Sequence, residues 1–181
     1  MNHIKLLGIS GSLRKASANR GLLRAAQSVL PAYATLDIAD LLDVPFYNAD
    51  LTEVPESVQR IARQASEADG FVFACTEYNY SIAPALKNIL DWLSRLPDAT
   101  ILSGKPAALM GAAGGMGSSR AQYHLRQVCI YLNLHPLNKP EVFANAFAGG
   151  FDDQGNLNDD KITVLIADQM SALVDEIGLR K

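Results

Sequence analysis

Residues 3–30 read HIKLLGIS, GSLRKASANR and GLLRAAQSVL in turn, and this stretch decides the fold. The first part is an apolar run typical of a buried strand, and the last part has the apolar spacing of a helix. The turn between them holds three cations and two serines, although the chain as a whole is acidic. A buried strand followed directly by a helix indicates an α/β protein, in which such a turn lies at the ligand-binding edge of the sheet.

The rest of the chain repeats this alternation of strand-like and helix-like segments. Helices are expected at 19–30, 54–68, 118–132 and 161–177, with another that has Ser81 as its N-cap. Strands are expected at 4–10, 33–38, 70–76, 105–111 and 134–138. The pattern predicts a five-stranded parallel sheet covered by helices on both faces. No linker divides the chain, so we expect residues 1–181 to form a single domain, with 149–161 as a surface loop.

Composition excludes several classes of protein. The 181 residues are 49% hydrophobic and 19% charged, with a net charge of -3, which is unlike a disordered chain or a general nucleic-acid binder. No apolar run is long enough to cross a membrane, and the N-terminus lacks a signal-peptide core, so we expect a cytoplasmic protein. Cys75 and Cys129 are expected to be reduced, packed thiols. The histidines have no neighbours at ligand spacing, so no metal site is expected.

The first loop, residues 10–20, is rich in groups that bind phosphate. Ser10, Ser12 and Ser17 offer hydroxyls, Asn19 an amide and Arg14 a planar cation, beside the positive end of a helix. Neither the Walker A pattern nor G-x-G-x-x-G is present, so the loop resembles a cradle for a single phosphate. The alternative is a capped helix with solvated charges.

The second loop follows the third strand and reads TEYNYSIAPALKNILDW, residues 76–92. Glu77, Tyr78, Asn79 and Tyr80 stand where the strand ends. Aromatic rings at this edge are able to wall a flat ring system, because tyrosine tolerates exposure. Taken alone, however, a tyrosine pair at a surface turn is more typical of packing than of ligand binding.

The third loop, MGAAGGMGSSRAQYHLRQ at residues 110–127, contains four glycines that would let backbone approach a ligand closely. A flexible strand-to-helix turn would look the same. All three loops, however, are expected on one edge of one sheet. A phosphate cradle, an aromatic wall and a glycine-rich rim together suit a phosphorylated planar cofactor, with FMN as the natural candidate.

The segments GSLRKASANR, TEYNYSIAPALKNILDW, GSSRAQYHLRQ and NKPE resemble the NAD(P)H-dependent FMN reductases, a flavodoxin-like family that includes quinone, azo-dye and chromate reductases. The resemblance covers nearly the whole chain. It implies a flavodoxin-like three-layer sandwich with strand order 2-1-3-4-5. It also implies a ping-pong reaction in which NADPH or NADH reduces bound FMN at N5, and the flavin then reduces a quinone or another electrophilic acceptor.

The resemblance assigns roles by position. Ser12, Arg14, Ser17 and Asn19 would hold the FMN phosphate, with Ser10 beside them, while Lys15 and Arg20 stay solvated or serve the second substrate. The ribityl chain and ring would be lined by Glu77, Tyr78, Asn79 and Tyr80, and the ring edge by Ala112 and Gly114. Two residues depart from the family pattern: Thr76 stands where proline is usual, and Ala112 where serine is frequent. No side chain is expected to act as an acid or base.

The resemblance further implies a homodimer or homotetramer with the flavin near a subunit contact, for which Arg120, Tyr123 and Glu141 are candidates. Two other functions remain open. A flavodoxin-type electron carrier is disfavoured by the small net charge and the cations of the first loop. A regulatory module that senses the redox state of a flavin is the third possibility.

Overall fold

The computed structural model describes residues 3–98 and 100–180 and contains one main sheet. Its strands are β1 (Ile4–Ser10), β2 (Ala34–Ile38), β3 (Gly70–Ala74), β6 (Pro106–Ala113), β7 (His135–Pro136) and β8 (Val142–Asn145). All its pairings are parallel, in the order β2-β1-β3-β6-β7, and β8 also pairs with β6. Because β4 and β5 form a separate hairpin, this is the predicted order 2-1-3-4-5, and the prediction is confirmed.

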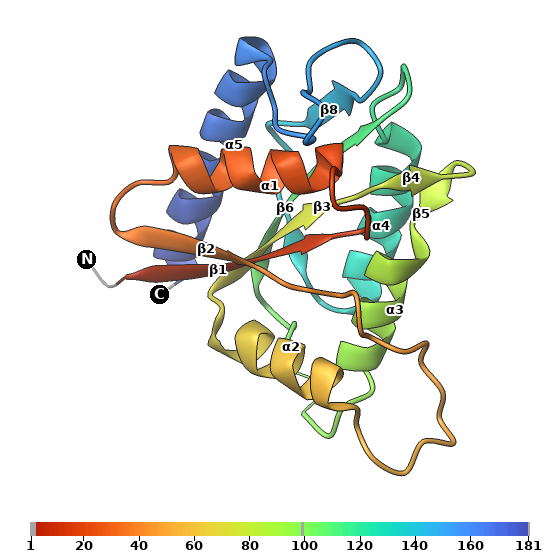
Figure 1. Ribbon diagram of the computed structural model, residues 1–181. Helices are drawn as coiled ribbons and strands as arrows, with labels where there is room; N and C mark the ends of the chain where they lie inside the picture. The colour runs from red at the N-terminus through yellow and green to blue at the C-terminus, as the bar shows by residue number, and fades with distance from the viewer. Residues whose placement is uncertain (1–2, 99, 181) are drawn as a thin grey trace.

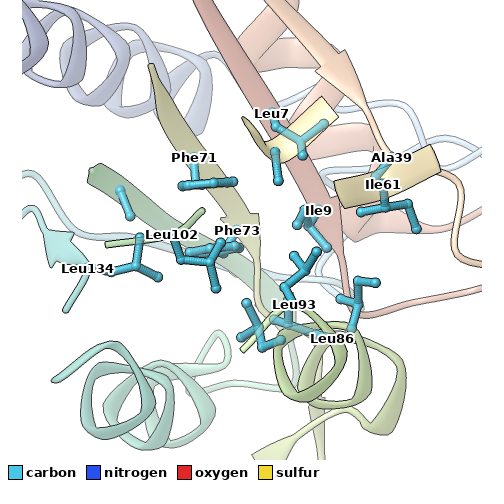
Figure 2. Close-up of a cluster of buried hydrophobic side chains, with 14 of the residues drawn as sticks. Leu7, Ile9, Ala39, Ile61, Phe71, Phe73, Leu86, Leu93, Leu102 and Leu134 are labelled. Carbon is cyan, nitrogen blue, oxygen red and sulfur yellow. The ribbon is translucent and has the colours of Figure 1, made fainter. Parts of the chain in front are cut away.

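Helices cover both faces of the sheet (Figure 1). One face carries α1 (Ala18–Val29) and α5 (Asp160–Arg180), and the other carries α2 (Glu56–Glu67), α3 (Pro84–Leu93) and α4 (Ser119–Tyr131). Side chains of β3 alternate between the two cores, so every residue of this central strand is buried. Figure 2 shows the second face, where Phe71 and Phe73 stack with ring centroids 5.6 Å apart above α3.

The fifth strand differs from the prediction of one strand at 134–138. It is split into β7 and β8, and β8 was not predicted. Pro140 lies in the gap and has no N–H to donate, so the ladder cannot run through it. The buried amide of Gln169 in α5 fills the gap instead, with Nε2 donating to the carbonyls of Leu109 (3.0 Å) and Pro140 (2.7 Å).

The expectation that Ser81 caps the next helix is wrong. Ala83 is the N-cap of α3, and Pro84 is its first residue, where the missing N–H and fixed φ of proline favour helix initiation. Ser81 belongs to β5 (Ser81–Ile82), which pairs antiparallel with β4 (Glu77–Tyr78). The two residues between these strands, Asn79 and Tyr80, both have positive φ (50° and 67°), as a type I′ hairpin turn requires.

The predicted surface loop at 149–161 packs against the start of α1. Gly155, with φ of 73°, is buried there, and a Cβ built on Gly21 would lie 1.8 Å from its carbonyl oxygen. Arg24 strengthens the contact, because its Nε donates to Asn156 Oδ1 at 2.9 Å. This loop therefore supports the first, phosphate-binding candidate loop, a role that its polar composition did not indicate.

We predict that Gly21→Ala lowers the free energy of unfolding by about 1–3 kcal/mol, because the new methyl group collides with the backbone of Gly155. Urea denaturation measures the change. Gly178→Ala is the matched control: Gly178 is also helical, but a Cβ there meets nothing within 4 Å. That variant should gain up to about 1 kcal/mol from helix propensity. Equal effects in the two variants would contradict the packing argument.

Candidate functional site

Three strand ends bring the three candidate loops together. Ser10 of β1 pairs with Ala74 of β3, and Ala74 pairs with Met110 of β6, so the loops that follow start side by side. Two backbone hydrogen bonds continue this arrangement past the strands, from Gly11 N to the Ala74 carbonyl (3.0 Å) and from Cys75 N to the Met110 carbonyl (2.7 Å). In Figure 1 the three loops lie at the same end of the sheet as the β4–β5 hairpin.

The first loop is organised by its serines, which are buried against its own backbone. The Ser12 N–H donates to Ser10 Oγ (3.2 Å), and the Arg14 N–H donates to Ser12 Oγ (3.4 Å). Ser17 is the N-cap of α1 and accepts from the Arg20 N–H (3.3 Å). In the contacts to Arg14 and Arg20, the hydroxyls of Ser12 and Ser17 act as acceptors, so each keeps an O–H for another oxygen.

Arg14 differs from the serines, because its side chain is exposed. Its guanidinium has no hydrogen-bond or ionic partner among residues 3–98 and 100–180. The first N–H groups of α1 also lack intrahelical acceptors, as in any helix. The loop thus combines hydroxyl donors, helix-start amides and one free planar cation in one short segment, which is the donor set that a phosphate monoester requires.

Asn19 links the first loop to the third. Its buried amide makes two hydrogen bonds to the backbone of Ala112, with Nδ2 donating to the carbonyl (2.8 Å) and Oδ1 accepting from the N–H (2.9 Å). The two residues are 93 positions apart in the chain, so no sequence pattern could reveal the contact. It places the end of β6 against the start of α1.

The hairpin of the second loop is attached to α4 by an ion pair. The Glu77 side chain is only 6% exposed, and Arg120 binds its Oε1 through Nε (2.9 Å) and Nη2 (2.8 Å). The other oxygen, Oε2, accepts from the Ala121 N–H (3.1 Å) near the start of α4. Arg120 also lies over the ring of Tyr80, 3.7 Å from its centroid. These contacts hold Tyr80 at its positive φ, a costly conformation for an aromatic residue.

The aromatic wall is open to solvent. Tyr78 and Tyr80 are 47% and 65% exposed, and Asn79 between them is exposed as well. Sequence reasoning selected these residues but missed Arg120 as the group that orients them. Its position in the first turn of a helix beside the glycine-rich loop was the available signal.

The glycines of the third loop have two different roles. A Cβ on Gly111 would lie 2.1 Å from Ser118 Oγ and 2.5 Å from the Cys75 carbonyl oxygen, and a Cβ on Gly117 would lie 2.7 Å from Phe143 Cβ. These two are needed for internal packing. Gly114 and Gly115 have nothing within 4 Å of a Cβ, so they border open space. Ala112 is buried, and its backbone is held by Asn19.

Two buried groups lie beneath the loops. Thr76 Oγ1 has no hydrogen-bond partner among the described residues, and the Thr76 Cβ lies 3.2 Å from the Cβ position of Gly11. Burial raises the pKa of Cys75 to about 12, and that of Cys129 likewise. Both cysteines are free thiols, and the raised pKa keeps them neutral and unreactive at physiological pH.

Comparison with known proteins identifies this arrangement. Residues 4–149 match the sequence profile of the NADPH-dependent FMN reductases. The chain belongs to this family. It is 49% identical over 173 residues to an NAD(P)H-dependent FMN reductase of Pseudomonas aeruginosa, and the alignment covers 94% of this chain and 93% of that relative. It is 44% identical over 183 residues to an NAD(P)H:quinone oxidoreductase of Solanum tuberosum, with coverage of 94% and 93%.

A solved structure agrees with the fold. FerB of Paracoccus denitrificans, a flavoenzyme NAD(P)H:(acceptor) oxidoreductase, superposes with a TM-score of 0.86 at 29% identity, over 97% of both chains. Within the part of the chain that the structure describes, no helix is long and apolar enough to cross a membrane. The family predicted from the loop motifs is therefore confirmed, together with its flavodoxin-like architecture.

We predict that Thr76→Val raises the free energy of unfolding by about 1 kcal/mol, because it removes a buried hydroxyl that makes no hydrogen bond. Thr163→Val is the control, since Thr163 Oγ1 donates to the Asp159 carbonyl at 3.0 Å. Losing that bond should cost about 0.5–1.5 kcal/mol. Denaturant titration of the apoprotein gives both values. A Thr76→Val protein less stable than the wild type would mean that the hydroxyl has a partner.

Proposed function

We propose that this chain is an NAD(P)H-dependent oxidoreductase that binds FMN across the three loops and reduces quinone-type acceptors. The observation that carries the proposal is the register of β1, β3 and β6, which places the hydroxyl-rich loop, the tyrosine hairpin and the open glycine rim at one sheet edge. Membership of the NADPH-dependent FMN reductase family supplies the chemistry that this geometry alone would leave open.

The residues present fit FMN. A phosphate monoester suits the free O–H groups of Ser12 and Ser17 with the Arg14 guanidinium. A planar ring needs a rim without side chains, and the open space at Gly114 and Gly115 supplies one. The two exposed tyrosines are able to cover an aromatic ring system. When bound, FMN supplies the hydride-accepting and electron-donating chemistry.

The chain itself binds and orients. Ser10 positions Ser12, and Ser12 with Arg14 and Ser17 holds the phosphate. The side-chain amide of Asn19 makes two hydrogen bonds to the backbone of Ala112. We propose that these bonds hold the 112–114 backbone against the edge of the flavin ring. Asn19 also completes the set of residues around the FMN phosphate. Glu77 acts through Arg120, which keeps Tyr80 in place, while Tyr78 and Asn79 are exposed on the same hairpin and line the ligand.

Enzymatic turnover is favoured over electron carriage. Electron carriers of the flavodoxin type dock their redox partners through an acidic surface of their own. The first loop of this chain instead carries the cations Arg14, Lys15 and Arg20, which suit a small anionic substrate. The relatives named above are reductases and oxidoreductases. We also propose that residues 1–181 act as one FMN-binding domain in the cytoplasm, which the free thiols Cys75 and Cys129 support.

The activity test uses purified protein loaded with FMN, a nicotinamide donor and a quinone. We expect the nicotinamide absorbance to fall when a catalytic amount of protein is mixed with an excess of quinone. It should not fall when either the protein or the quinone is left out. A yellow protein that leaves the donor intact would instead support the carrier or sensor function. A protein that does not bind added FMN would contradict all three functions.

The cofactor cradle has a separate test. We expect Ser12→Ala and Arg14→Ala each to weaken FMN binding by about tenfold or more, the loss of one charge-assisted hydrogen bond, with riboflavin binding unchanged because riboflavin lacks the phosphate. Flavin fluorescence quenching measures both affinities. Ser28→Ala and Arg63→Ala, exposed residues away from the loop, are the matched controls. Equal losses for FMN and riboflavin would place these residues elsewhere in the site.

We further propose a homo-oligomer that uses α4 as a contact. Tyr123, Ile130 and Tyr131 expose 68%, 79% and 71% of their area on this helix, and exposed apolar side chains gathered on one element favour an interaction surface. Arg120, paired with Glu77, and Glu141, paired with Lys139, are the candidate polar contacts. Light scattering of Tyr123→Arg tests it: an unchanged mass would exclude α4 from the contact.

A further inference from the structure

A small groove with a positive lining opens beside the first loop, outside the cradle of serines. It has a volume of about 310 Å3 and is formed by the end of the first loop, the outer side of α1 and the segment after β2. Its lining residues are Leu13, Lys15, Arg20, Arg24, Asp40 and Leu42. None of Ser10, Ser12 and Ser17 lines it, so it is distinct from the position proposed for the FMN phosphate.

The cations of this groove outnumber its one carboxylate. The side chains of Lys15 and Arg20 have no hydrogen-bond or ionic partner among residues 3–98 and 100–180. Arg24 donates to the neutral oxygens of Asn156 and Gln154. The pKa of the nearby Asp152 carboxyl is lowered by a hydrogen bond from the Asn156 side chain and also by the charge of Arg24. Arg24 therefore contributes less than Lys15 and Arg20. Asp40 is the one carboxylate in the lining. The groove therefore has a net charge of +2 in a chain whose net charge is -3.

The chemistry of the proposed reaction limits what this groove would bind. Quinones are neutral, and the single phosphate of FMN is accommodated by the serine cradle. The remaining anionic ligand is the dinucleotide donor. NADH and NADPH share a pyrophosphate, and NADPH adds a 2′-phosphate, a compact monoester of nearly two negative charges with three acceptor oxygens. Lysine and arginine on flexible stems suit such a group, and a space of this size holds a phosphate and its ribose better than a whole dinucleotide.

We propose that Lys15 and Arg20 bind the 2′-phosphate of NADPH and give this chain a preference for NADPH over NADH. The proposal rests on the proposed function, since it assumes a nicotinamide donor. Leu13 and Leu42, which are 45% and 71% exposed, flank the groove and offer apolar contact to the attached nucleoside. Arg24 supports the positive potential from below, while its own guanidinium is held by the 152–156 loop.

Donor kinetics of the FMN-loaded enzyme test the proposal. In Lys15→Ala/Arg20→Ala we expect kcat/KM for NADPH to fall by about thirtyfold or more through KM, with kcat/KM for NADH within about twofold of wild type. Arg63→Ala is the control for a change of net charge, because Arg63 lies on α2 across the sheet, and it should alter neither donor. The cap of α1 uses only the Arg20 N–H, so α1 should stay intact when the Arg20 side chain is removed.

Three results would overturn the proposal. An equal loss for both donors would mean that the groove binds the shared pyrophosphate. Weaker FMN binding in the double variant would make the groove part of the cofactor cradle. Unchanged kinetics with both donors would mean that the cations stay solvated.

A binding measurement separates this proposal from the reductase function. Calorimetric titration of the FMN-loaded protein with 2′-AMP should show binding that is absent with 5′-AMP and lost in Lys15→Ala/Arg20→Ala. If the wild type oxidises neither donor but still binds 2′-AMP in this way, the reductase function fails and the phosphate site stands. If it oxidises both donors equally well and does not bind 2′-AMP, the phosphate site fails and the reductase function stands.

Discussion

β3 pairs in parallel with β1 on one side and β6 on the other, and the site depends on the register of these two ladders. The register aligns Ser10, Ala74 and Met110, so that three loops leave the sheet at the same level. It is strongly determined, because the side chains of β3 alternate between the two cores and a slip by one residue would exchange them. The hydrophobic core thus sets the strand register, and the register in turn positions any ligand that contacts all three loops.

Beyond the strand ends, the loops are held by contacts between backbones and small or polar side chains. Gly21 and Gly155 let the 149–161 segment lie against the start of α1, and Asn19 ties that helix to Ala112. The Glu77–Arg120 pair similarly fixes the strained Tyr80 turn. These contacts leave Gly114, Gly115 and the exposed ring of Tyr78 free to meet a ligand, while the Tyr80 ring is held by Arg120.

The charge around the first loop is divided in the same way. Buried hydroxyls and helix-start amides form a cradle that requires little net charge, with Arg14 beside it, while Lys15, Arg20 and Arg24 surround a separate groove. Two neighbouring anion positions would let one edge of the sheet hold a cofactor phosphate permanently and a donor phosphate transiently. Binding in the exposed groove should weaken with salt more than binding in the buried cradle, because exposed charges are screened.

The amino-acid sequence by itself determined the elements whose signal is local. Buried strands and amphipathic helices in alternation were sufficient for a parallel sheet covered on both faces, and the three loops for the choice of flavin. The sheet order came from the family that the loop motifs resemble. Only the tertiary structure decided how the loops are joined: the Asn19–Ala112 contact, the Glu77–Arg120 pair, the packing of Gly155 on Gly21, and the division of the fifth strand with Gln169 in its gap. Each of these links residues far apart in the chain, and its energy exists only after the sheet has brought them together. Ser81 is a good local N-cap but lies in the β4–β5 hairpin. The helix instead starts at Pro84, after the hairpin turn in which Asn79 and Tyr80 have positive φ.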